Sequence, residues 1–228
     1  MLALLQSTDR SYQIRYRKIE QGDQAFIYPR VTFQLEFEMA LPEQKEVLFL
    51  WAIREEGHLG RYRLVSIVGL TDGVTRGFLT KLARRGYVKT SKYVGCALTA
   101  KGKKRLRELL ARLRIHEIRE IDIGNLSLAS KSMVAHIRGG TRSIRSGIEQ
   151  RDAAIKAGAI GAITVIFHDD KFLLPPDHFD LSKKNVGLTE RFHQEFQLSE
   201  GDVLVISSAD DRWRAIEGVL GAAATLQA

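Results

Sequence analysis

Two runs of sequence, LTKLARRGYV at residues 79–88 and LTAKG at residues 98–102, decide how the first half of this chain folds. In the first run, Leu79 and Leu82 stand at helical spacing before Gly86, which predicts a helix that ends at the glycine. The second run opens another helix. Between the two helices, residues 87–90 and 94–99 predict two short strands joined as a hairpin.

Three helical patterns precede the hairpin. Pro42 opens the first helix and is followed by carboxylates in the first turn. Residues 61–68 predict a short second helix. Thr71 or Asp72 caps the third helix, which runs to about Arg85. Its inward positions are Val74, Phe78, Leu79 and Leu82, and its other face carries Thr75, Arg76, Thr80, Lys81 and Arg84.

The positive charge of the chain is concentrated on the same stretch. The 228 residues carry 35 Lys and Arg against 27 Asp and Glu, which gives a net charge of +8 and a pI near 9.7. Residues 57–115 hold 15 basic and 2 acidic side chains, a net charge of +13. A solvated charged face normally mixes both signs. The excess therefore indicates an anionic partner such as nucleic acid.

The order helix, helix, helix, hairpin, helix predicts a winged helix-turn-helix over residues 42–116. A helix that carries Arg, Lys and Thr on its free face can enter the major groove of DNA, and cations on the hairpin can reach phosphates. We therefore expect this domain to bind double-stranded DNA, although the same fold also serves protein contacts. The residues expected at the DNA are Arg61, Arg63, Asp72, Thr75, Arg76, Thr80, Lys81, Arg84, Lys89, Lys92 and Tyr93.

The second half of the chain has a different pattern. Strands are expected at residues 133–137, 159–167, 172–174 and 202–208, and helices at residues 144–157 and 211–226. The order β-α-β-β-β-α predicts a small α+β sandwich over residues 131–228, with two helices on one face of an antiparallel sheet. The fold class expected for the whole chain is α+β.

Two stretches lie outside these domains. Residues 117–130 leave the basic zone and contain Gly124 and Asn125, which predict a linker. Residues 1–41 form an N-terminal extension in which apolar residues partly alternate, and this favours one or two added strands. An alternative start at Met39 would leave the first helix complete.

With both halves in place, the chain resembles an archaeal family of predicted transcriptional regulators, in which a winged helix precedes a C-terminal domain of unknown function. The likeness is carried by EQRDAAI at residues 149–155, by Gly161 and Ala162, and by the strand and hairpin that lead to Pro-Pro-Asp177. It covers about residues 42–228. The resemblance implies a C-terminal fold similar to the GAD domain, a small α+β module also found in some tRNA-linked enzymes, and it implies no known ligand.

A glycine-containing turn is the candidate site for an anionic effector in the second half. Its backbone N–H groups and cations stand between a strand and a helix, where they could surround an anion. The run matches neither the dinucleotide fingerprint nor the phosphate-binding loop of nucleotide hydrolases, and a glycine turn with solvated arginines is the alternative. The residues are Arg138, Gly139, Gly140, Thr141, Arg142 and Arg145.

Other chemistry finds little support in the sequence. Histidines stand beside carboxylates at residues 168–170, 177–178 and 193–195, but no HxxxH or HExxH spacing occurs, so we expect no metal. No nucleophile, base and acid are ordered together, and we expect neither an enzyme nor a cofactor. Cys96, the single cysteine, is expected to be a small packed residue rather than a redox switch.

The combined prediction is a DNA-binding transcriptional regulator that acts as a homodimer, with the C-terminal domain dimerising or sensing a ligand. No apolar stretch approaches the ~18 residues that a membrane span needs. A single cysteine suits a reducing compartment, and we expect a cytoplasmic protein without a membrane partner. An RNA- or translation-associated binding protein is the alternative, and an enzyme acting on a small anionic metabolite is a third class.

Overall fold

A computed structural model of the chain describes residues 14–21, 24–31, 43–91 and 94–227. Two compact units are present, Met1–Ala40 and Leu41–Ala228. In the first unit, β1 (Ile14–Gln21) and β2 (Gln24–Val31) pair as an antiparallel hairpin, where the partial alternation predicted strands. The rest of that extension, residues 1–13, 22–23 and 32–41, lies outside the described part of the chain.

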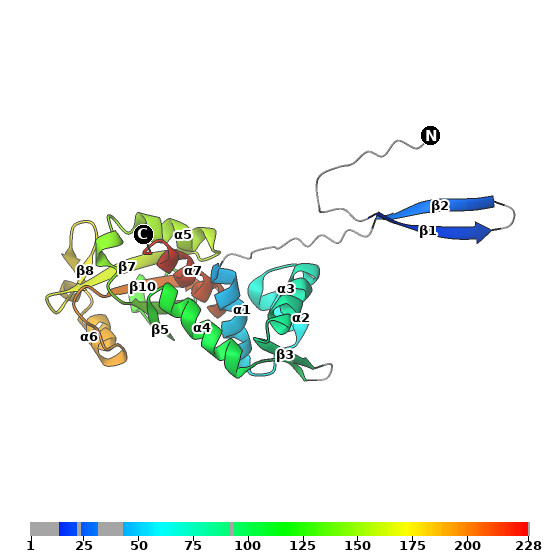
Figure 1. Cartoon of the computed structure of the whole chain (residues 1–228). Coiled ribbons are helices and arrows are strands. Elements are labelled where there is room, and N and C mark those ends of the chain that lie inside the picture. The colour runs from blue at the N-terminus through cyan, green and yellow to red at the C-terminus, as the bar shows by residue number, and fades with distance from the viewer. Residues whose placement is uncertain (1–13, 22–23, 32–42, 92–93, 228) are drawn as a thin grey trace. The chain divides into compact units, whose positions relative to one another are not determined.

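The second unit begins with the helical segment, residues 43–112, which has the expected order of elements (Figure 1). Its elements are α1 (Glu43–Glu56), α2 (Arg61–Val68), α3 (Asp72–Arg84), β3 (Val88–Ser91), β4 (Gly95–Leu98) and α4 (Ala100–Arg112). β3 and β4 form an antiparallel hairpin. Both α3 and α4 begin at a threonine whose side chain accepts a backbone N–H of the first turn, Thr71 for α3 and Thr99 for α4.

The sheet segment, residues 115–227, holds a six-stranded antiparallel sheet with strand order β5-β6-β10-β7-β8-β9. The strands are β5 (Ile115–Glu120), β6 (Lys131–Ile137), β7 (Gly161–His168), β8 (Lys171–Leu174), β9 (Phe179–Asp180) and β10 (Val203–Ala209). The helices are α5 (Ile148–Lys156), α6 (Val186–Glu195) and α7 (Arg212–Ala224), and short 3-10 turns lie at Gly124–Leu126, Thr141–Ser143 and Leu181–Lys183.

Alternate residues of β10 separate two apolar cores. Val203 and Val205 face the core that α5, α7 and the helical segment share, whereas Leu204 and Ile206 face the core beneath α6. The small residues of α7 allow close packing within the chain, since a Cβ at Gly218 would meet Ser207 and Ala159. That face of α7 therefore packs on its own sheet.

Three sequence expectations about this segment are corrected. The first part of the expected linker 117–130 belongs to β5, which pairs with β6. The expected pair of helices on one face is joined by α6 on the other face, where Phe192 and Phe196 fill the core. The helix expected at residues 144–157 is shorter, since α5 spans Ile148–Lys156, and its Ile148 and Ile155 are about half exposed at 50% and 47%.

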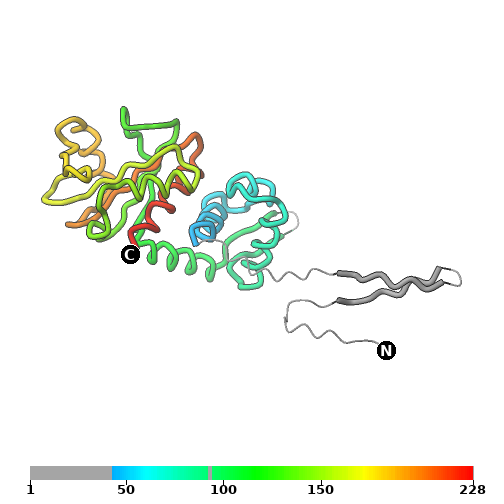
Figure 2. Tube along the Cα trace, turned by 90° about the horizontal axis from the view of Figure 1, so that it is seen from above, coloured from blue at the N-terminus to red at the C-terminus, as the bar shows by residue number. Residues whose placement is uncertain are grey.

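The helical and sheet segments share a polar junction between α1 and α7. Lys45 pairs with Glu217, whose side chain is only 6% exposed, and the Lys45 Nζ also donates to the Val68 carbonyl at 2.9 Å. Arg212 pairs with Glu55 at 3.1 Å. The C-terminal residues lie beside the end of α4, where Gln227 donates to the Arg112 carbonyl (Figure 2). Within the described residues, no helix combines the length and the apolar character that crossing a membrane requires.

Candidate functional site

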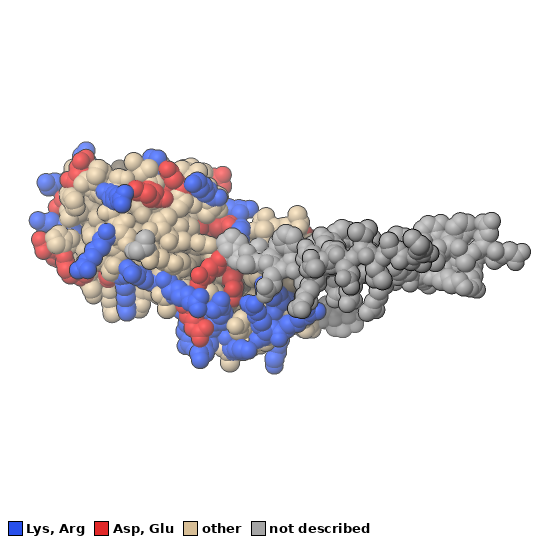
Figure 3. Space-filling view, turned by 45° about the horizontal axis from the view of Figure 1, so that its top comes forward, with Lys and Arg blue, Asp and Glu red and all other residues tan. Residues whose placement is uncertain are grey.

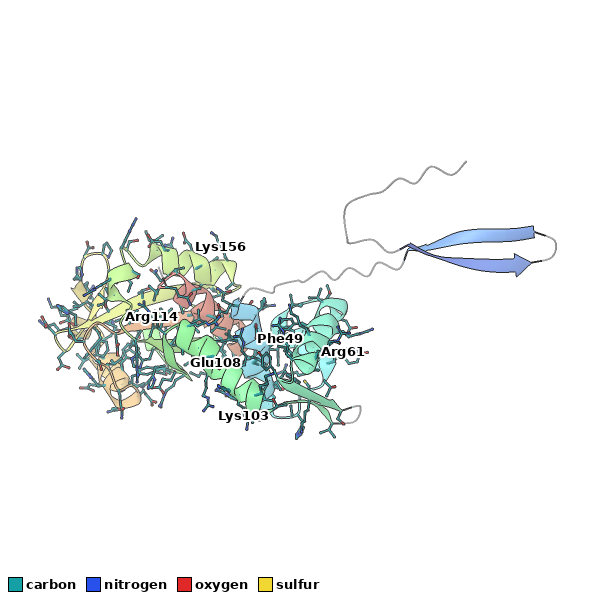
Figure 4. All side chains as sticks on the ribbon, in the orientation of Figure 1. Phe49, Arg61, Lys103, Glu108, Arg114 and Lys156 are labelled. Atoms are coloured by element: carbon teal, nitrogen blue, oxygen red, sulfur yellow. The ribbon has the colours of Figure 1, made fainter. Side chains whose placement is uncertain are left out.

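Helix α3 presents a polar outer face because its apolar face is anchored in the core of the helical segment. Phe78, Leu79 and Leu82 are buried, and the Phe78 ring lies 4.7 Å from that of Phe49, which points inward from α1 (Figure 4). Because a helix repeats about every 3.6 residues, the opposite side is left to solvent. Its exposed residues are Gly73, Arg76, Gly77, Thr80 and Arg84.

A groove of about 700 Å³ runs between α3, the start of α2 and the β3–β4 hairpin. Four of the residues expected at DNA line this groove together, and the hairpin forms its other wall with Thr90, Ser91 and Val94. The sequence predicted the two sides of the groove separately, and the fold brings them together. The four are Arg61, Arg76, Thr80 and Arg84.

Asp72 organises two of these cations. Its carboxylate lies 2.8 Å from Arg61 Nε and 2.8 Å from Arg76 Nη2, so one acid at the start of α3 holds both guanidinium groups at the groove. An exposed ion pair of this kind contributes only about 0.2–1 kcal/mol to stability. The ion pairs with Asp72 matter more for position, because they hold the guanidinium groups of Arg61 and Arg76 beside the groove.

Three further cations of α3 and β3 have no acidic partner among the described residues. No described carboxylate pairs with Lys81, Arg84 or Lys89, and Arg84 and Lys89 are exposed. Figure 3 shows Lys and Arg side chains gathered over the helical segment, whereas both signs mix over the sheet segment. The excess of positive charge counted in the sequence therefore forms a surface that includes the groove.

The remaining residues expected at DNA are placed differently. Thr75 is fully buried, so its assignment to the outer face of α3 is wrong; it belongs on the same side as Phe78 and Leu79. Arg63 turns toward the end of α1, where it pairs with Glu56 at 3.0 Å. Lys92 and Tyr93 lie outside the described residues.

The glycine-containing turn uses its donors within the protein. The Gly139 N–H donates to Asp202 Oδ1 at 3.0 Å, and the Thr141 hydroxyl donates to the Gly201 carbonyl at 2.7 Å. Gly140 is buried, and Arg138 donates to His116 Nε2 at 3.2 Å. Arg142 and Arg145 are exposed. The turn does hold an anion, but that anion is the carboxylate of Asp202.

Asp202 and its neighbours form a polar cluster that the sequence analysis missed. Asp202 is 4% exposed and also accepts the Ser199 N–H at 2.9 Å, and its Oδ2 lies 2.7 Å from Nε2 of the fully buried His136. The sequence signal was a single histidine in the otherwise apolar run MVAHI at residues 133–137. Its partners were not visible, because Asp202 comes 66 residues later in the chain.

A second group of potential ligands lies in the loops named by the sequence analysis. His168, Asp169 and Glu200 come together, and all three are exposed. Hydrogen bonds from the Asp169 N–H and from His168 lower the pKa of the Glu200 carboxyl from its ordinary value. Glu200 therefore already has His168 and the Asp169 N–H as hydrogen-bond partners within this group.

The comparison with solved structures agrees with the fold, and the matches with known proteins name no activity. Residues 128–226 match a family described as a domain of unknown function, DUF4443. Among solved structures, the chain is similar to hypothetical protein PH0730 from the archaeon Pyrococcus horikoshii OT3, with 23% sequence identity and a TM-score of 0.64. That similarity covers 82% of this chain and 92% of the other. A search of curated proteins gave no match.

Proposed function

We propose that residues 43–112 are a winged helix-turn-helix that binds double-stranded DNA, and that the chain is a transcriptional regulator. The observation that carries the proposal is the groove between α3 and the hairpin, which collects Arg61, Arg76, Thr80 and Arg84 on a surface with excess positive charge. Such a surface suits a polyanion, since each neutralised phosphate releases condensed counterions.

The proposed docking places α3 in the major groove. An α-helix fits this groove, and Arg and Thr side chains can hydrogen-bond to base edges there. Arg84 and Thr80 on the exposed face are then candidates for base or phosphate contacts. Lys89 on β3 would meet the backbone of the same duplex, as the wing does in proteins of this architecture. The exposed Gly77 has open space around it, so a sugar or phosphate can approach the helix backbone closely.

Crosslinking followed by affinity measurement tests the proposal. Genome-wide crosslinking of the full chain should recover enriched duplex sequences, and fluorescence anisotropy with one of these measures the affinity. Arg84→Ala should weaken binding by about 1–3 kcal/mol. Lys156→Ala is the matched control, because it removes an exposed cation from α5 and should leave the affinity unchanged. Equal affinities of the Arg84→Ala variant and the unaltered chain would contradict the proposal.

RNA binding is the alternative outcome of the same assay. Unlabelled duplex DNA and a structured RNA are added in turn as competitors against the labelled duplex. The proposal expects the duplex to displace the probe at the lower concentration. If the RNA is the better competitor, the protein is instead an RNA- or translation-associated binding protein.

We also propose that the regulator is a homodimer, since such proteins match two-fold symmetric operators. Ile148 and Ile155 support a contact through α5, because exposed apolar side chains on one helix face often mark a protein interface. Sedimentation should show a dimer that Ile155→Glu converts to a monomer. A monomeric unaltered chain would refute this part alone. Ligand sensing by the sheet segment stays a prediction, although within the expected effector site the Gly139 N–H already donates to Asp202.

A further inference from the structure

A β-bulge in β5 places His116 and Glu117 opposite His136 of β6. β5 and β6 pair Ile115 with Ile137, but the next aligned pair is Glu117 with His136, so His116 is an extra residue in β5. In a bulge, two residues of one strand oppose a single residue of the other. His116, Glu117 and His136 are thereby gathered, and each offers a ligand atom within 4.8 Å of the other two.

His136 is buried with one ring nitrogen unused. Its side chain is fully buried, and Nε2 lies 2.7 Å from Asp202 Oδ2. An ionised carboxylate only accepts hydrogen bonds, so we assign the proton to Nε2 and a lone pair to Nδ1. This Nδ1 is buried and has no hydrogen-bond partner among the described residues. Buried polar atoms without a partner are rare in folded proteins and need an explanation.

We propose that His116, Glu117 and His136 bind a divalent transition-metal ion, with Nδ1 of His136 as one ligand. Two imidazoles and a carboxylate are a ligand set that Zn²⁺ accepts, and three protein ligands leave a coordination position open. Asp202 would act as a positioning residue. A histidine that binds a metal usually donates its other ring N–H to a carboxylate, and Asp202 already accepts from Nε2 of His136.

Two arginines next to the site moderate its affinity. Arg138 Nη2 lies 3.2 Å from His116 Nε2, and Arg119 Nε lies 2.7 Å from Glu117 Oε2. Both arginines are exposed and can turn away, and each occupies only one of the two potential ligand atoms of its partner. Their positive charges oppose a bound cation. Arg138→Gln should therefore tighten metal binding.

The exposed group of His168, Asp169 and Glu200 provides the internal comparison. Its side chains are all open to solvent, and His168 is already hydrogen-bonded to Glu200. It therefore lacks the buried, unpartnered nitrogen that distinguishes the site at the bulge.

The test uses the full chain, stripped with a chelator and then titrated with ZnCl₂ against a chromophoric competitor. One ion should bind per chain, and His116→Ala should weaken binding by at least the roughly 10–100-fold that loss of an outer-shell partner costs. His168→Ala is the matched control and should bind as the unaltered chain does. Zn²⁺ should raise the melting temperature of the unaltered chain and of His168→Ala, but not of His116→Ala.

Several results would overturn the proposal. The unaltered chain would fail to bind Zn²⁺, or His116→Ala would bind it as tightly as the unaltered chain does, or His168→Ala would lose binding instead. Melting in the presence of chelator checks that each variant is folded. If His116→Ala fails that check, Glu117→Gln replaces it with the same expected loss of affinity, and unchanged binding by Glu117→Gln then counts against the site.

Discussion

At the scale of single residues, two glycines on neighbouring helices have opposite surroundings. Gly102 lies on the buried side of α4, where the Tyr87 carbonyl occupies the position of a Cβ. Gly77 lies on the exposed face of α3, and nothing stands within 4 Å of a Cβ there. Packing therefore requires a glycine at Gly102. Nothing within the described chain requires a glycine at Gly77.

Alanine at these two positions should change stability in opposite directions. Gly102→Ala should destabilise the protein by about 1–3 kcal/mol, because the methyl group must push the Tyr87 carbonyl away. Gly77→Ala should stabilise it by about 0.5–1 kcal/mol, because alanine loses less backbone entropy in a helix. Denaturant-induced unfolding measures both. Stabilisation by Gly102→Ala would show that α4 does not approach Tyr87 this closely.

Cys96 should be inert in the folded protein. Burial raises the pKa of its thiol, and hydrogen bonds within the chain offset only part of that effect. The Sγ donates to the Leu59 carbonyl at 2.9 Å, and the side chain is 3% exposed. Because the thiolate is the reactive form, iodoacetamide at neutral pH should label Cys96 slowly in the native protein and readily in denaturant. Mass spectrometry follows the labelling, and rapid native labelling would contradict this placement.

At the scale of elements, helices α1 and α7 connect the helical segment to the sheet segment through ion pairs. Arg54 and Arg212 both donate to Glu55, at 2.8 and 3.1 Å. Burial alone would raise the pKa of Glu55, but the hydrogen bonds from these two arginines outweigh it and lower the pKa from 4.5. Glu55 is thus a carboxylate whose ionised form is favoured by folding.

This lowered pKa predicts the pH dependence of the junction. Between the lowered pKa and 4.5, the folded state binds fewer protons at Glu55 than the unfolded state does, so stability rises with pH. The contribution of Glu55 is complete above pH 4.5 and is lost as the pH falls through the folded-state pKa. Denaturant unfolding should show the unaltered chain more stable than Glu55→Gln at pH 6, with the difference shrinking in acid. A difference that stays constant in acid would show that the pKa of Glu55 is not lowered by folding.

The helices and strands also show which parts of the fold can be predicted from the sequence alone. The helices of the helical segment were predictable because their apolar spacing and glycine stops are local signals. Strand β5 was missed because its bulge interrupts the alternation, and Glu117 and Arg119 made it look like a linker. Helix α6 was missed because its apolar residues Leu188 and Phe192 are few, and they find their core only against strands that are distant in sequence.

At the scale of the whole molecule, the sequence predicted the concentration of positive charge and the two sides of the groove, but not the cluster around Asp202. The count over residues 57–115 predicted where an anionic partner would bind, and the groove gathers Arg61 with Arg76 and Arg84 from separate helices. Periodicity placed Thr75 on the wrong face, because a buried threonine has the same local pattern as an exposed one. The cluster around Asp202 depends on contacts between distant strands, which no local pattern shows.

Duplex DNA binding by the helical segment is best tested by the salt dependence of the affinity. If the segment binds duplex DNA, the logarithm of the association constant should fall linearly with the logarithm of salt concentration, by about 0.9 per phosphate contacted. Lys81→Ala should make that slope shallower by about 1, whereas Lys156→Ala should leave it unchanged. An affinity independent of salt, or equal changes in slope for the two variants, would show that this surface does not bind the DNA backbone.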